Sequence, residues 1–378
     1  MKTVLAVILI IVLLGGGTAF WLFKMPEQVR PDGPISQQRY KAGPYGVIHE
    51  SFTAVDKSRP TQPNRSYPGA ADRTFKGSIW RAAGVKQPMP LLVYSHGFMS
   101  FHDEGVYLAT LLASQGYTVV SVNYPLTHFF APGKPQIEDV VNQPADVSFL
   151  IDTVLARSAD ADDVLHNTVD PARIAVAGLS LGGLTSELVA FHSKVMDQRI
   201  KASVSIAGPA AMLTSTFFQA HPIPFMMIGG DSDAMVPYEV NALPIPQKYP
   251  GSVLVTMKGG SHAGFSAMAA TVLRFYSNPD SLGCAKLKEG LHDVKDNFLA
   301  SLTGEQYGVV VTDRRMPCAN GVLEVAMNAA RQQMFTALAI DAFLDGVFAD
   351  SKEERDNAQV YLKQQLMQEN GTEVSVVY

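Results

Sequence analysis

The chain has little cysteine, little charge and no excess of basic residues. Two cysteines in 378 residues are too few for a disulfide-dense scaffold or for a zinc site made of four thiolates. Thirty basic residues against 35 acidic ones give a net charge of −5, which excludes a protein that binds nucleic acid through bulk positive charge. Charged residues make up only 17% of the chain, but 47% are hydrophobic, which excludes disorder as its general state.

A long apolar segment stands at the N-terminus. The uncharged run Thr3–Phe23 lies between Lys2 and Lys24, and its length matches the ~20 residues that a membrane-spanning helix needs. The alternative is a cleaved secretory signal with the apolar run Val4–Leu14 and cleavage after Ala19. The apolar run continues past the glycines, which favours the anchor. Both interpretations predict an exported protein, either anchored and facing the periplasm or the outside, or secreted.

The remaining sequence divides into a linker and one α/β domain. After the N-terminal segment, residues 1–24, the proline- and glycine-rich residues 25–44 predict a linker. The domain is expected to span residues 45–350, and a C-terminal helix and tail residues 351–378. Strands that alternate with helices predict a mostly parallel central sheet flanked by helices. The expected strands are Gly46–Val55, Arg73–Arg81, Leu91–Tyr94, Thr118–Val122, Arg173–Ala177, Ala202–Ile206, Phe225–Ile228 and Val253–Met257. The expected helices include Asp103–Gln115, Asp139–Ala156 and Leu181–His192.

One motif carries most of the chemical information. Gly178-Leu179-Ser180-Leu181-Gly182 fits G-x-S-x-G and lies between an expected strand and an expected helix, as a nucleophile elbow requires. Glycines on either side of Ser180 remove the Cβ atoms that would clash in so tight a turn. The helix N-terminus favours negative charge near the serine. The alternative is a glycine-rich turn with a capping serine.

The other parts of a catalytic triad follow in the required order of serine, acid and histidine. A serine hydroxyl is a weak nucleophile and needs a general base that a carboxylate orients. Asp233 lies in the turn after an expected strand and is the candidate acid; Asp231 is the alternative, which a turn-capping role would explain. His262 follows the next strand, at the sheet edge where catalytic groups gather, and is the candidate base.

Two backbone N–H groups are candidates for an oxyanion hole. One belongs to Leu181, directly after the serine, and the other to Phe98, which follows Gly97 in the loop after the strand Leu91–Tyr94. His96 in the same loop is interpreted as a packed structural histidine. No metal or cofactor is predicted, because acyl transfer by these groups needs none.

Several segments together resemble the α/β-hydrolase superfamily over about residues 46–265. Within it, the chain is similar to the branch of platelet-activating-factor acetylhydrolase-like enzymes and predicted dienelactone hydrolases. The segments that carry the resemblance are Asp56–Pro60, Phe75–Trp80, Tyr94–Phe98, Asn142–Phe149, Gly178–Gly183 and Gly260–His262.

The resemblance implies the α/β-hydrolase fold and a serine carboxylic-ester hydrolase acting on short-chain or lipid-derived esters. The matching positions are Ser180 as nucleophile, Asp233 as acid, His262 as base, and Phe98 and Leu181 as oxyanion donors. Dienelactone hydrolases themselves use a cysteine nucleophile, so their activity is not expected here.

The chain continues well beyond His262, although the family fold implies only one more helix. Asn328–Phe348 is expected to be that helix, which leaves about residues 276–321 as an insertion. Cys284 and Cys318 lie at its two ends and are expected to form a disulfide in an exported domain; the alternative is two free thiols in a reducing compartment. The insertion is expected to shape a lid or an acyl pocket.

Three further functions stay open. The first is phospholipase A-type lipid hydrolysis, the second is polyester degradation, and the third is a catalytically inactive, membrane-tethered interaction module. The complete set of Ser180, Asp233 and His262 argues against the last. The expected partners are therefore a small-molecule or lipid ester and, through the N-terminal segment, a membrane, but no nucleic acid.

Overall fold

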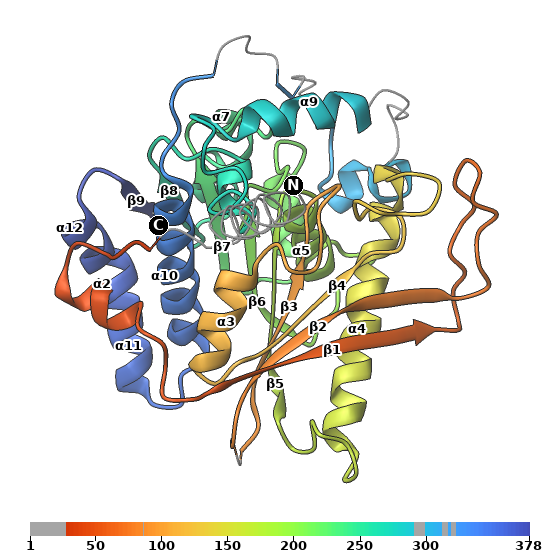
Figure 1. Ribbon diagram of the computed structural model, residues 1–378, viewed down its shortest axis with the longest axis horizontal. Coiled ribbons are helices and arrows are strands. Elements are labelled where there is room, and N and C mark those ends of the chain that lie inside the picture. Colours follow the sequence, from red (N-terminus) through yellow and green to blue (C-terminus); the bar gives the residue numbers. More distant parts are fainter. Residues whose placement is uncertain (1–27, 86, 291–298, 312–316, 319–322) are drawn as a thin grey trace, which may run out of the picture.

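The computed structural model describes residues 28–85, 87–290, 299–311, 317–318 and 323–378 (Figure 1). The apolar segment Thr3–Phe23 lies outside these residues, so the structure does not test the predicted anchor or signal. Within the described ranges, no helix combines the length and the apolar character needed to cross a membrane.

One central sheet organises the molecule. In the described part of the chain it has nine strands in the order β1-β2-β4-β3-β5-β6-β7-β8-β9. The strands from β4 across to β8 pair in parallel, whereas β1, β2 and β9 pair antiparallel. Their bounds are β1 Val47–Asp56, β2 Arg73–Ala82, β3 Met89–Ser95, β4 Thr118–Asn123, β5 Val169–Leu179, β6 Ile200–Ile206, β7 Phe225–Gly230, β8 Val253–Met257 and β9 Val374–Val377. The predicted α/β fold with a mostly parallel sheet is confirmed.

Helices cover both faces of this sheet (Figure 1). One face carries α4 and α5, and the other carries α3 and α10. The longer helices are α3 Val106–Ser114, α4 Gln143–Ala159, α5 Leu181–Phe191, α9 Asp280–Gly290, α10 Ala329–Phe348 and α11 Lys352–Val360. The short ones are α2 Pro34–Arg39, α6 Ser215–Gln219, α7 Tyr238–Asn241, α8 Ile245–Lys248, α12 Leu366–Asn370, η1 Ile137–Asn142, η2 Ala263–Phe265, η3 Ala300–Leu302, η4 Glu305–Tyr307 and η5 Tyr361–Gln365.

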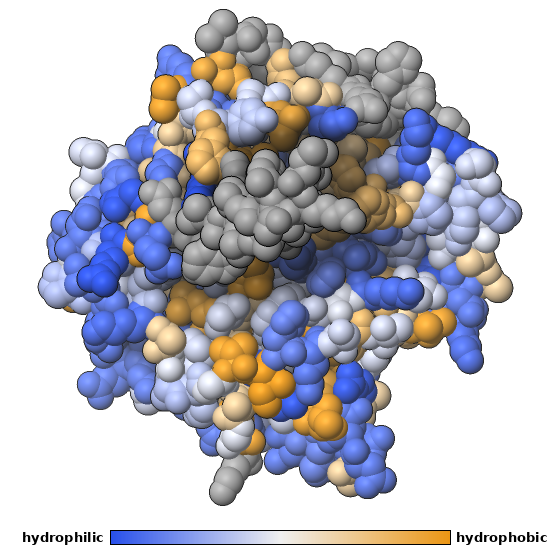
Figure 2. All heavy atoms as spheres, in the orientation of Figure 1, coloured by the Kyte–Doolittle hydropathy of each residue, from blue (hydrophilic) through white to orange (hydrophobic). Residues whose placement is uncertain are grey.

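Strand β3 shows why the inner strands are continuous apolar runs. Leu91 and Val93 belong to the core layer under α4 and α5, whereas Leu92 belongs to the layer under α3 and α10. Successive side chains of a strand point to opposite faces, and here both faces are covered. On the face shown in Figure 2, hydrophobic side chains form separate patches among hydrophilic ones. The low charge of the chain thus reflects two core layers rather than a uniformly apolar surface.

Both ends of the described chain pack against the domain. Strand β9, in a region expected to hold a helix and a tail, pairs with β8. Helix α2, within the expected linker, binds the C-terminal helices: the Ser36 hydroxyl lies 2.8 Å from the Tyr361 hydroxyl, and Glu369 accepts the N–H groups of Ile35 and Ser36. Sequence patterns missed both contacts because each segment acquires its structure from a partner far away in the chain.

Candidate active site

Ser180 stands at a sharp turn between β5 and α5. Its backbone has φ 57° and ψ −117°, a strained conformation for a residue with a side chain. Its N–H donates to the carbonyl of Ile206 on β6 (2.8 Å), which fixes the turn to the sheet. A Cβ atom on Gly182 would collide with the Ser95 carbonyl, so the motif needs glycine there. The structure therefore places the serine at the carboxyl end of β5, where α5 begins.

Asp233 and His262 come from the loops after β7 and β8 and form a buried pair. Nδ1 of His262 lies 2.7 Å from Oδ2 of Asp233. The other carboxylate oxygen accepts the N–H groups of Met235 (2.8 Å) and Val236 (2.7 Å), so the carboxylate is fixed in orientation. When the imidazole is neutral, its Nδ1–H donates to Asp233 and leaves Nε2 free to accept a proton.

Nearby charge changes the acidity of His262. Burial lowers its pKa, but the negative charge of Asp233, the hydrogen bond to Asp233 and the charges of Asp280 and Glu104 outweigh this effect. The pKa of His262 is therefore raised above its ordinary value. A raised pKa means that the environment stabilises the imidazolium, the form that arises when the neutral imidazole accepts a proton.

The alternative acid, Asp231, lies elsewhere. Its Oδ1 accepts the N–H of Gly259 at 2.6 Å, and its Oδ2 lies 3.4 Å from Nζ of Lys258. Asp231 thus binds the loop that leads to His262, while Asp233 contacts the imidazole itself. The neighbouring Ser261 is held by Gln332 of α10, which accepts its N–H (3.1 Å) and donates to its carbonyl (2.7 Å).

A cavity of about 670 Å³ joins these groups. Ser180, His262 and both predicted oxyanion residues, Phe98 and Leu181, line it. Most of the remaining lining is apolar, and it includes Phe101, Phe129, Ile137, Met212, Val240 and Leu273. The structure thereby brings together the predicted site residues at the carboxyl ends of β3, β5 and β8.

The loop that carries Phe98 is fixed by His96. The imidazole is fully buried, and its Nε2 accepts the N–H of Tyr124 at 3.1 Å. The proton is therefore on Nδ1, which donates to the Gly97 carbonyl at 2.7 Å. Burial lowers the pKa of His96 to about 3, so this side chain stays neutral at ordinary pH. His96 is a packed structural histidine, as expected from the sequence.

Glu104 is a titratable side chain of the cavity that the sequence did not reveal. Its Oε1 accepts the N–H of Gly97 (3.0 Å) and the hydroxyl of Tyr94 (3.3 Å). Burial raises the pKa of Glu104 to about 7. An acidic residue just before a helix is usually explained by the helix dipole, so only its burial in the fold distinguishes this one.

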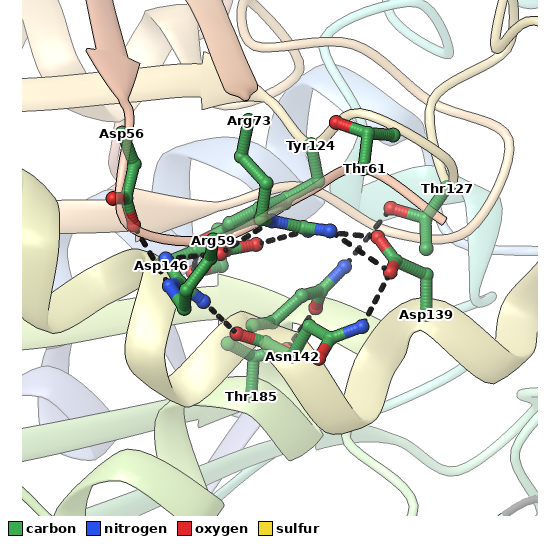
Figure 3. A network of polar contacts seen from close by, with 12 residues as sticks. Asp56, Arg59, Thr61, Arg73, Tyr124, Thr127, Asp139, Asn142, Asp146 and Thr185 are labelled. Atoms are coloured by element: carbon green, nitrogen blue, oxygen red, sulfur yellow. Dashed lines mark hydrogen bonds and ion pairs between the residues drawn. The ribbon is translucent and has the colours of Figure 1, made fainter. Parts of the chain in front are cut away.

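A buried ionic network supports the far side of the site (Figure 3). Arg73 at the start of β2 binds Asp146 of α4 through Nε (2.9 Å) and Nη2 (2.6 Å). It also binds both oxygens of Asp139, at 3.1 and 2.9 Å. Arg59 adds ion pairs to Asp56 (2.7 Å) and Asp146 (2.8 Å). These contacts fix the N-terminus of α4 against the edge of the sheet.

Gln143, the first residue of α4, connects that network to the cavity walls. Its Nε2 donates to the Thr127 hydroxyl (2.9 Å), and the Thr127 carbonyl accepts the N–H of Met99, next to Phe98. Its Oε1 accepts the hydroxyl of Thr185, which also lies 3.0 Å from the Leu181 carbonyl. One buried amide thus links the chain segments that carry the two predicted oxyanion donors.

The predicted disulfide is present. Cys284 of α9 is bonded to Cys318, with 5.5 Å between their Cα atoms. A disulfide is typical of proteins in oxidising compartments, which is consistent with export. The cavity lining includes Leu282, Gly283 and Pro317 beside the two cysteines, so this segment contributes to the cavity wall.

Comparison with known proteins identifies the family. A family model described as PETase: PET hydrolase-like matches residues 66–277, more than half of the chain, and the chain belongs to this family. The match includes Ser180, Asp233 and His262. No curated protein matches the chain. Membership confirms the α/β-hydrolase superfamily and makes the protein an ester hydrolase.

Proposed function

We propose that this member of the PET hydrolase-like family is a serine carboxylic-ester hydrolase that works through an acyl-enzyme intermediate. The main support is the arrangement of the buried pair: His262 contacts Asp233 on one side and lines the same cavity as Ser180. The strained backbone of Ser180 at a helix N-terminus adds to this support.

The reaction proceeds in two steps. Nε2 of His262 takes the proton of the Ser180 hydroxyl as Oγ attacks the ester carbonyl carbon. Asp233 stabilises the imidazolium that forms, and the N–H groups of Phe98 and Leu181 bind the oxyanion. The imidazolium then protonates the leaving alcohol. Water attacks the acyl-enzyme with His262 again as base, and the acid is released.

The substrate class follows from the cavity. Its lining is largely apolar, which favours short-chain or lipid-derived esters with uncharged acyl groups. We propose that the enzyme acts outside the cytoplasm, since its disulfide suits an oxidising compartment.

The exposed side chains at the cavity mouth favour a second candidate, phospholipase A-type hydrolysis of lipid esters. Phe129, Met268, Leu282 and Val311 line the cavity and are also exposed. Phe130 is 75% exposed and packs edge-to-face against Phe129, with ring centroids 5.1 Å apart. An apolar rim would contact a lipid surface, and equally the surface of a polyester such as the one in the family's description.

The nucleophile is tested by the variant Ser180→Ala. We expect it to abolish p-nitrophenyl acetate hydrolysis and labelling by a fluorophosphonate probe. Ser301→Ala, at an exposed serine outside the cavity, is the matched control and should label like the wild type. Wild-type turnover in Ser180→Ala would contradict the proposal, and a wild type that does not label would favour the inactive interaction module. Rates on phospholipid vesicles, polyester film and soluble esters then separate the substrate classes.

A further inference from the structure

We propose that Asp280 is a positioning residue of the active site, a second carboxylate that holds the loops of Asp233 and His262 together and stabilises the imidazolium. The inference rests on the proposed roles of Ser180, Asp233 and His262. Asp280 is the first residue of α9, which lies at one end of the sheet (Figure 1), and it falls beyond the part of the chain that the family model matches.

The carboxylate of Asp280 binds main-chain groups of both catalytic loops. Its Oδ2 accepts the N–H of Ala234, the residue after Asp233, at 3.0 Å. The same oxygen accepts the N–H of His262 at 3.0 Å, and Oδ1 accepts the N–H of Ala263 at 2.7 Å. The side chain is fully buried. Charge-assisted hydrogen bonds of this kind are about twice as strong as neutral ones, so Asp280 fixes the distance between the two loops.

The surrounding segment fixes Asp280 in turn. Asn278 accepts the N–H of Asp280 at 2.9 Å and donates to the Glu324 carbonyl at 2.8 Å. The disulfide joins α9 to Cys318, whose N–H donates to the Ala234 carbonyl at 2.7 Å. Ala234 is thus held through its N–H by Asp280 and through its carbonyl by Cys318, on two chain segments that the disulfide links.

The charge of Asp280 has a chemical consequence beyond geometry. His262 faces three carboxyl groups: Asp233 after β7, Asp280 of α9, and Glu104 before α3. Lys286 of α9 lines the same cavity. After Asp233, Asp280 contributes to the raised pKa of His262, because a negative charge nearby favours the imidazolium. The same attraction stabilises the imidazolium that forms in each transition state.

The test is the pH profile of Asp280→Asn, which removes the charge at almost constant size. Without that charge His262 stays neutral to lower pH, so the acid limb of kcat/KM should move down by roughly one pH unit. The plateau of kcat should fall about 10- to 100-fold, because the loops lose a shared acceptor. A purely structural role would lower the rate without moving the limb. Asp341→Asn, at a buried aspartate that pairs with Arg39 of α2, is the control and should leave the limb in place.

A second variant keeps the test independent of how well Asp280→Asn folds. Asp280→Glu retains the charge but displaces the carboxylate, so kcat should fall while the acid limb stays at its wild-type pH. An unmoved limb in folded Asp280→Asn, or a wild-type kcat in Asp280→Glu, would overturn the inference. Because Ser180→Ala reports on the triad separately, an inactive Ser180→Ala beside a wild-type Asp280→Asn would reject only the role of Asp280.

Discussion

The two sides of the active site are held in different ways. On the acid–base side, Asp233 and His262 are linked by a second carboxylate, that of Asp280, from a segment closed by a disulfide. On the oxyanion side, the segments that carry Phe98 and Leu181 are linked by the neutral amide of Gln143. The full charges of the Arg73 network (Figure 3) lie at the N-terminus of α4, the helix that begins with Gln143.

The difference follows the charge that each side must stabilise. In the proposed reaction, an imidazolium develops on the acid–base side, and a nearby carboxylate favours it. An oxyanion develops on the other side, where an ionised carboxylate would oppose it. Glu104 accepts the N–H of Gly97 beside Phe98 and, when ionised, adds to the raised pKa of His262; burial raises its own pKa to about 7, so it loses this charge below neutral pH.

The largest effect is expected from loss of the direct partner of His262. Asp233→Asn should lower kcat by on the order of 10³- to 10⁴-fold, because the imidazolium loses its counter-charge and the imidazole its fixed tautomer. Steady-state hydrolysis of p-nitrophenyl acetate measures this. Asp231→Asn removes the charge that faces Lys258, keeps an oxygen for the Gly259 N–H, and should retain most of the activity; an equal loss in both variants would make Asp231 a second candidate acid.

A smaller loss of rate should come from the oxyanion side. Gln143→Leu leaves the Thr127 hydroxyl without its Gln143 partner, which costs about 1–3 kcal/mol of stability for a buried group, and leaves the Thr185 hydroxyl only the Leu181 carbonyl. We expect kcat to fall roughly 10-fold, with the acid limb of the pH profile unchanged because no charge near His262 is lost. Gln198→Leu, at an exposed glutamine, is the control. A shifted limb in Gln143→Leu would abolish the distinction between the two sides.

The disulfide should matter more for stability than for rate. Replacing both Cys284 and Cys318 by serine should lower the free energy of unfolding by about 2–4 kcal/mol, measured by urea denaturation. Because Asp280 still binds both loops, kcat should fall only several-fold. A loss as large as that of Asp280→Asn would mean that the disulfide, rather than the carboxylate, holds the acid–base side.

The smallest effect on activity is expected from Glu104→Gln, which puts a side chain that is neutral at every pH in this position. The pKa of Glu104 is about 7 in the folded protein against an ordinary value of 4.5, so its burial costs no stability at low pH. The free energy of unfolding therefore falls by about 3 kcal/mol as the pH rises from 4.5 through 7. Urea unfolding at pH 5 and pH 8 should therefore show a smaller decrease in Glu104→Gln than in the wild type, and an equal decrease would exclude this role of Glu104.

Much of the candidate site could be inferred from local patterns. Ser180 lies in a motif whose glycines are required by a single turn, and Asp233 and His262 each follow a recognisable apolar strand. Glu104, Gln143 and Asp280 carry no such signal. Gln143 and Asp280 bind residues that are distant in the sequence, as Asp280 does Ala234, 46 positions away, whereas Glu104 is distinguished by its burial in the fold.

Local sequence patterns predicted the α/β sheet, the chain order of Ser180, Asp233 and His262, and the pairing of Cys284 with Cys318. These depend on periodicity, on tight-turn chemistry and on there being only two cysteines. The tertiary structure alone decided which aspartate contacts His262, what closes the sheet at β9 and which neutral and charged groups support each side of the cavity. Those features arise from burial and long-range hydrogen bonds, whose strength depends on the removal of water by segments that meet only in the folded chain.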